Sequence, residues 1–66
     1  MNTYQLVCLD ETIINIYEIE GDIINTYIIV YSDGTTETVK RDSIASVVFL
    51  NDNIDCECVV EIFKID

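Results

Sequence analysis

Residues Ile28 to Lys40, IIVYSDGTTETVK, contain two runs of strand-forming residues that meet across Asp33-Gly34. An Asp-Gly pair between β-branched and aromatic residues is a strong local signal for a β-hairpin, because glycine tolerates the positive φ of tight hairpin turns. We expect a two-residue turn that pairs Val30 with Glu37. The hairpin fixes a pair of antiparallel strands in this part of the chain.

The same turn determines which side chains share a face of the hairpin. One face would carry Ile24, Ile28, Val30 and Val39, and the other would carry Tyr27, Ile29, Tyr31, Thr36 and Thr38. Neither face is cleanly polar, although a half-exposed antiparallel sheet alternates apolar and polar residues. Two explanations stay open. The long strand bends to serve two sheets of a small barrel, or the outer stripe of Tyr27, Ile29 and Tyr31 is an interface, a role that suits tyrosine.

Short strand-like segments separated by polar turns make up the whole chain. They are Tyr4–Leu9, Ile13–Ile19, Ile23–Tyr31, Thr35–Lys40, Val47–Leu50 and Cys56–Ile65. RDSIAS, residues 41–46, breaks this pattern as a single helical turn, and no stretch has sustained helical periodicity. We therefore predict one small β domain over residues 1–66. It is all-β, with five or six antiparallel strands that form either a small SH3-like barrel or a strongly bent sheet.

The order of these segments resembles that of the small SH3-like and Tudor-like barrels. The stretch from Asp33 to Leu50, DGTTETVKRDSIASVVFL, carries the resemblance, since a helical turn follows a tight hairpin and precedes a short strand. The resemblance implies the barrel fold and no function, because one small fold serves many functions.

The charge of the chain restricts its partners. There are 13 acidic residues against 3 basic ones, which gives a net charge of −10 over 66 residues. Direct nucleic-acid binding is not expected, because neutralising phosphates requires a Lys and Arg surface, and an anionic membrane would repel the chain. The acidity favours a protein partner with a basic surface. A hydrophobic fraction of 50% in so small a domain also favours a partner or a homodimer.

The expected location is the cytoplasm. Met1 to Leu9 lacks the basic start and apolar core of a secretion signal, and no segment has the roughly 18 apolar residues of a membrane span. The odd number of cysteines suits a reducing compartment. Abundant Asn and Ile, with their AT-rich codons, point to a low-GC bacterium or its phage, in which case the compartment is that of the host cell.

The sequence contains few of the residues that enzymes use for catalysis. The chain has no His, so it lacks the usual general base and any Ser-His or Cys-His pair. Gly21 and Gly34 are its two glycines, which rules out a glycine-rich phosphate loop. We predict that the protein is not an enzyme and that it has no catalytic residues and no cofactor.

The three cysteines are the candidate metal ligands. Cys56 and Cys58 alternate within a predicted strand, so their sulfurs would share one face, and Cys8 could add a third thiolate. Structural zinc sites have four ligands, commonly from C-x-x-C on a turn. We interpret the thiols as core residues and predict no metal site, with metal binding and redox chemistry as the alternatives.

Glu18, Glu20 and Asp22 alternate along EIEGD and would face one way on an extended strand, about 6.7 Å apart. A row of carboxylates at that spacing is comparable to the phosphates of a nucleic-acid strand. The predicted acidic binding face consists of Glu18, Glu20, Asp22, Glu37, Glu57 and Glu61.

Two functional hypotheses follow from these features. In the first, the protein is an inhibitor that occupies the basic nucleic-acid-binding surface of another protein. It would act as a DNA mimic, in the manner of phage anti-CRISPR or anti-restriction proteins. In the second, it is a structural or adaptor module of a phage or host complex, assembled through Tyr27, Ile29 and Tyr31. Binding by mimicry should weaken steeply with salt, whereas apolar assembly should not.

Overall fold

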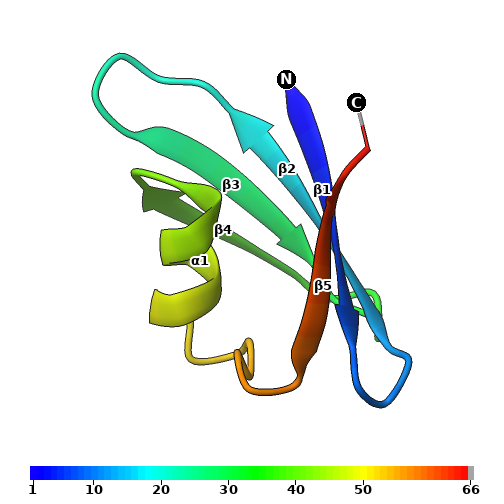
Figure 1. Cartoon of the computed structure of the whole chain (residues 1–66). Helices are drawn as coiled ribbons and strands as arrows, with labels where there is room; N and C mark the ends of the chain where they lie inside the picture. The colour runs from blue at the N-terminus through cyan, green and yellow to red at the C-terminus, as the bar shows by residue number, and fades with distance from the viewer. Residues whose placement is uncertain (66) are drawn as a thin grey trace.

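The computed structural model describes residues 1–65, which form one open antiparallel sheet with a short helix on one face (Figure 1). The elements are β1 (Asn2–Cys8), β2 (Ile13–Ile19), β3 (Asn25–Val30), β4 (Thr36–Arg41), α1 (Ile44–Leu50) and β5 (Val59–Lys64). The strand order is β4-β3-β2-β1-β5, and every pairing is antiparallel. The predicted all-β class and a count of five strands are confirmed.

The sheet does not close. β4 and β5 lie at its opposite edges and do not pair with each other, so the barrel alternative is wrong. The physical reason lies between them: the segment Val47–Leu50, which was predicted as a strand, belongs to α1. The chain therefore covers one face of the sheet with a helix instead of supplying a strand to close it.

Helix α1 forms because of its cap and its apolar spacing. The Ser43 side chain accepts a hydrogen bond from the Ser46 backbone N–H at 3.2 Å and caps the first turn. Ile44, Val47 and Val48 then lie on one side of the helix, and the two valines are buried against the sheet. The local strand propensity of the valines is outweighed by this tertiary burial.

The β3–β4 hairpin has a three-residue loop. The Tyr31 N–H donates to the Thr35 carbonyl at 2.8 Å, and the Gly34 N–H donates to the Tyr31 carbonyl at 3.0 Å. Gly34 has a φ of 88°, as expected for a type I turn followed by a left-handed residue. Val30 consequently pairs with Thr36. The predicted two-residue turn is wrong by one residue, and Val39 moves to the face of Tyr27.

The core lies between α1 and the covered face of the sheet. Its buried members are Leu6, Cys8, Ile14, Ile16, Tyr27, Ile29, Val47, Val48 and Ile54. Tyr27 and Ile29 have 0% exposure, so their prediction as part of an outer stripe is wrong. Sequence periodicity separates the two faces of a strand, but it does not show which face the helix covers.

The opposite face of the sheet has no covering layer among residues 1–65. By register, Ile13 and Ile19 of β2 point to this face, as do Ile28 of β3 and Phe63 of β5. The side chains of Ile13, Ile19 and Phe63 are 41%, 44% and 46% exposed. This is the physical basis of the mixed alternation in the sequence: β2 and β3 are apolar on both faces, and only one face is buried within the chain.

Candidate binding site

A groove of about 710 Å³ lies at the end of the sheet where the two hairpin turns meet the segment that links α1 to β5. Its walls include four carboxylates, Asp10, Asp33, Glu37 and Asp55. Among the described residues, none that lines the groove is Lys or Arg. The groove is therefore a negatively charged concavity.

Two of these carboxylates are held by matching turns. Asp33 accepts hydrogen bonds from the Thr35 backbone N–H at 2.9 Å and from its hydroxyl at 2.6 Å. Asp10 accepts from the backbone and hydroxyl of Thr12 at 3.1 and 2.6 Å. The threonine hydrogen bonds lower the pKa of both aspartates, because they stabilise the charged form. Both carboxylates thus stay ionised well below neutral pH.

Glu37 is the most connected carboxylate of the groove. It accepts a hydrogen bond from the Tyr31 hydroxyl at 2.6 Å, from the Asn53 amide at 3.1 Å and from the Asn51 amide at 3.4 Å. The hydrogen bonds from Tyr31 and Asn53 lower the pKa of Glu37. Desolvation, followed by the hydrogen bond to Glu37, raises the pKa of Tyr31 to about 12. Glu37 is therefore a fixed negative charge on β4.

The arrangement suits organic cations better than a metal ion. Within residues 1–65, no group of three or more His, Cys, Asp or Glu side chains is placed to hold a metal. The groove carboxylates come from the two hairpin turns, from β4 and from the segment before β5, so each can accept hydrogen bonds from a separate ammonium or guanidinium group. Such charge-assisted hydrogen bonds are the strong ones in protein recognition.

The predicted row of Glu18, Glu20 and Asp22 does not form. Strand β2 ends at Ile19, so Glu20 and Asp22 lie in the following loop. Glu18 points to the covered face and accepts hydrogen bonds from the Tyr27 hydroxyl at 2.5 Å and the Asn2 amide at 2.8 Å. The single strand face predicted for these three residues is wrong, because Glu18 is committed to the interior network.

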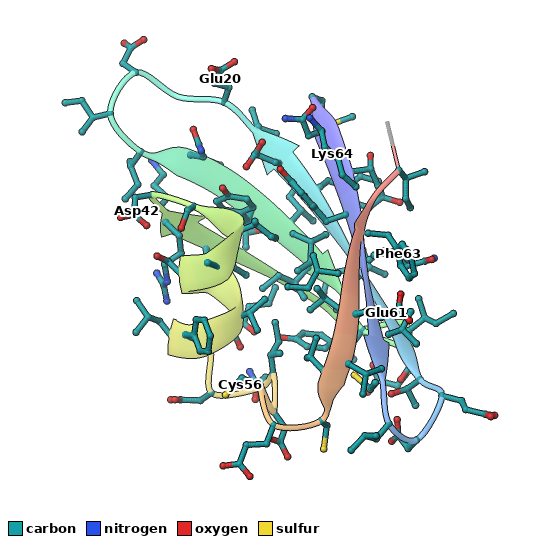
Figure 2. All side chains as sticks on the ribbon, viewed as in Figure 1. Glu20, Asp42, Cys56, Glu61, Phe63 and Lys64 are labelled. Atoms are coloured by element: carbon teal, nitrogen blue, oxygen red, sulfur yellow. The ribbon has the colours of Figure 1, made fainter. Side chains whose placement is uncertain are left out.

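The other predicted acidic residues are also dispersed. Glu37 lines the groove, Glu57 lies in the turn before β5, and Glu61 points to the uncovered face of β5. Figure 2 shows Glu20, Asp42 and Glu61 on widely separated parts of the molecule. Of the six residues assigned to an acidic face, only Glu37 belongs to the groove. A binding role for the others stays a prediction.

Sequence reasoning missed Asp10, Asp33 and Asp55 as site residues. A signal for the first two is present, because each stands two positions before a threonine in a hairpin turn, as D-E-T and D-G-T. Asp55 accepts from the Glu57 backbone N–H at 3.1 Å, which again places an aspartate in a turn. What the sequence does not reveal is that strand pairing brings these turns to the same end of the sheet.

The apolar and thiol candidates have separate positions. Tyr27 and Ile29 lie in the core, and Tyr31 is half-buried beside the groove. Cys8 is buried and Cys58 is half-buried, in line with core packing. Cys56 is exposed (Figure 2). Its prediction as a core residue is wrong because β5 begins after it.

A scan against models of protein families and searches of curated proteins and of solved structures each find no match to this chain. Within residues 1–65, no helix has the length and apolar character needed to cross a membrane.

Proposed function

We propose that this protein is a small acidic binding protein that docks onto a basic surface of another protein. The observation that carries this proposal is the groove, whose walls include four carboxylates and, among the described residues, no basic side chain. The net charge of −10 adds a long-range field, which accelerates encounter with a positively charged partner and disfavours acidic ones.

The partner class that fits this surface is a nucleic-acid-handling protein. Such a protein has a basic groove that accepts phosphates, and an acidic domain bound there blocks nucleic acid by both charge and volume. The activity is then inhibition, as in anti-CRISPR or anti-restriction proteins of phage. The contacts we assign to the partner's Lys and Arg side chains are the groove carboxylates Asp10, Asp33, Glu37 and Asp55, in place of a row along β2.

The test is an affinity capture from a nuclease-treated lysate of a low-GC bacterium at low and high salt, followed by titration of the purified partner. A groove variant carries Asp10→Asn, Asp33→Asn, Glu37→Gln and Asp55→Asn, substitutions that retain a hydrogen-bond acceptor at each position. A matched control variant carries Glu20→Gln, Asp22→Asn, Asp42→Asn and Asp52→Asn, which lie outside the groove lining. Each variant loses the same amount of negative charge.

The expected partner is a basic nucleic-acid-binding protein that elutes as the salt concentration rises. The groove variant should bind it at least about tenfold more weakly, and the control variant should stay close to the wild type. Equal losses in the two variants would show that general charge, and not the groove, drives binding. A partner that stays bound at high salt would contradict the proposal.

A second candidate function has one observation in its favour. The uncovered sheet face exposes Ile13, Ile19 and Phe63, and exposed apolar side chains on one face can mark an assembly site. An adaptor module would use this face instead of the buried Tyr27 and Ile29. Salt-insensitive assembly, abolished by Ile19→Lys on this face but unaffected by the groove variant, would favour this function.

A further inference from the structure

The two edges of the sheet differ in how well they are protected. On β4 nearly all side chains are polar, and the one aliphatic residue, Val39, packs against the core. On β5 the side chains of Val60, Ile62 and Phe63 are 51%, 46% and 46% exposed. Natural proteins usually blunt an edge strand with polar or charged residues. The edge formed by β4 follows this rule throughout. The edge formed by β5 follows it only in part, with Glu61, Lys64 and an irregular pairing between Val59 and Glu61 beside its exposed apolar side chains.

The backbone of β5 presents hydrogen-bonding groups at the open side of the sheet. The Ile65 N–H donates to the Thr3 carbonyl of β1 at 2.8 Å. In an antiparallel strand, the backbone N–H and C=O groups of successive residues point alternately toward one neighbouring strand and toward the other. Those of Ile65 point toward β1, so those of Ile62 and Lys64 point away from β1. No strand among residues 1–65 pairs with this side of β5. The edge therefore offers the hydrogen-bonding pattern that an added strand requires.

The side chains of β5 offer contacts on both faces of such a strand. Ile62 pairs with Leu6 and points to the covered face, but α1 lies over β3 and β4, away from β5 (Figure 1). Phe63 pairs with Gln5 and points to the uncovered face. A strand placed beside β5 would cover part of Ile62 on one face and part of Phe63 on the other, with apolar burial worth roughly 25 cal/mol per Å².

Charge indicates what kind of strand fits. Glu61 lies on β5 and Glu57 lies just before it, while Asp55 lines the groove from the same connecting segment. Lys64 is the basic residue of β5, and its positive charge interacts electrostatically with the Glu18 carboxylate. A second copy of the chain would bring a further net charge of −10 to the seam, and like charges oppose association. A strand with basic residues has the complementary sign.

We propose that β5 is a docking edge that takes an extended segment of a basic partner protein, in which apolar residues alternate with Lys or Arg. The segment adds as a sixth strand, with backbone hydrogen bonds to Ile62 and Lys64. This inference rests on the proposed function, since it assigns the form in which the basic partner is recognised. Side chains that extend past the start of β5 would reach the carboxylates of the groove.

The test uses the full chain, labelled with ¹⁵N, and a short synthetic peptide in which Lys and Val alternate, at about 150 mM salt, where long-range charge attraction is screened. On binding, the amides of Ile62 and Lys64 should shift in the NMR spectrum, and their hydrogen exchange should slow. A peptide with Glu in place of Lys should not bind.

Two proline variants provide a matched control. Ile62→Pro removes an outward N–H donor of β5 without removing a hydrogen bond to β1, as is tolerated at sheet edges. Thr38→Pro makes the same change on β4, where the N–H also points outward, since Thr35 pairs inward with Tyr31. The first should weaken peptide binding about tenfold and the second should leave it unchanged. If Ile62→Pro fails to fold, Ile62→Lys keeps the strand and repels the peptide.

Other results would overturn the inference in distinguishable ways. Shifts confined to the groove residues would refute docking at β5 while supporting the proposed function. Protection of Ile62 and Lys64 without peptide, together with a dimeric mass, would show that the edge pairs with a second copy. Equal binding of the Glu-containing peptide would refute the role of charge. Absence of binding anywhere on the protein would count against both the inference and the proposed function.

Discussion

Tyr27 lies in the first half of β3 and Tyr31 directly follows its last residue, and both donate a hydrogen bond to a glutamate in different surroundings. Tyr27 donates to Glu18 at 2.5 Å and has 0% exposure, with its ring inside the core. Tyr31 donates to Glu37 at 2.6 Å, is half-buried and lines the groove. In each pair the glutamate stays charged, because the tyrosine hydrogen bond lowers the glutamate pKa.

The two pairs differ in burial and not in bonding chemistry. At the Tyr27 end, the network of Glu18, Asn2 and Asn25 satisfies a hydroxyl group that the core surrounds. At the Tyr31 end, a similar pair holds a carboxylate at the wall of an open groove. One end should therefore govern stability, and the other should govern binding.

The largest expected effect is on stability at the Tyr27 end. Tyr27→Ala should lower the free energy of unfolding by about 3–5 kcal/mol, because it leaves a cavity in the core and removes the tyrosine hydrogen bond to Glu18. That is a large share of what a domain of this size possesses. Tyr31→Ala should cost about 1–2 kcal/mol, since its ring is partly in solvent. Urea denaturation followed by circular dichroism measures both, and equal losses would refute the distinction.

High pH should affect the two tyrosine pairs alike, in contrast to truncation of the side chains. Burial and the glutamate hydrogen bonds raise the pKa of both tyrosines to about 12 from 10.0. The raised pKa means that the folded protein favours the neutral tyrosine hydroxyl. This contribution to stability is fully present below pH 10 and is lost as the pH rises through 12. Thermal unfolding scans between pH 9 and pH 12 should show stability falling as the pH rises, and Tyr27→Phe and Tyr31→Phe should each make this fall shallower by a similar amount.

Ultraviolet titration of the tyrosines provides the independent check. Tyr27 and Tyr31 should ionise near pH 12, and each phenylalanine variant should remove one of these late components. If Tyr27 and Tyr31 ionise near pH 10 in the folded protein, their pairs with Glu18 and Glu37 do not contribute to stability as we infer.

The sequence predicts the strands well because each β segment is local and sharply bounded. Ile13–Ile19 matches β2 at both ends, and Asp33-Gly34 correctly marks a hairpin. The failure at Val47–Leu50 has a tertiary cause: valines that favour strands are held in a helix because they fill the core beneath it. The spacing of Ile44, Val47 and Val48 was the local sign of that helix.

The site was less predictable than the fold because it depends on long-range pairing. A shift of one residue in the β3–β4 turn is enough to exchange the faces of β4, which moves Glu37 beside Tyr31. The two aspartate turns come together only because β1–β2 and β3–β4 are neighbouring hairpins of one sheet. Neither fact can be obtained from spacing along the chain.

The smallest expected effects come from these two turns and sharpen the contrast between the ends. Glu11 and Gly34 occupy equivalent positions in the turns that flank the groove, with φ values of 71° and 88°. Gly34→Glu should cost about 1 kcal/mol, because an L-residue is disfavoured there, and Glu11→Gly should recover a similar or smaller amount. In the double variant the two backbone effects should largely cancel, so its stability should be close to that of the wild type. Its composition and net charge are unchanged, which excludes a charge effect. Urea denaturation of the three variants measures this directly. If Gly34→Glu costs nothing, the positive φ at this position does not disfavour an L-residue. If it costs as much as Tyr27→Ala, the groove end contributes as much to stability as the core end, and the contrast between the two ends is wrong.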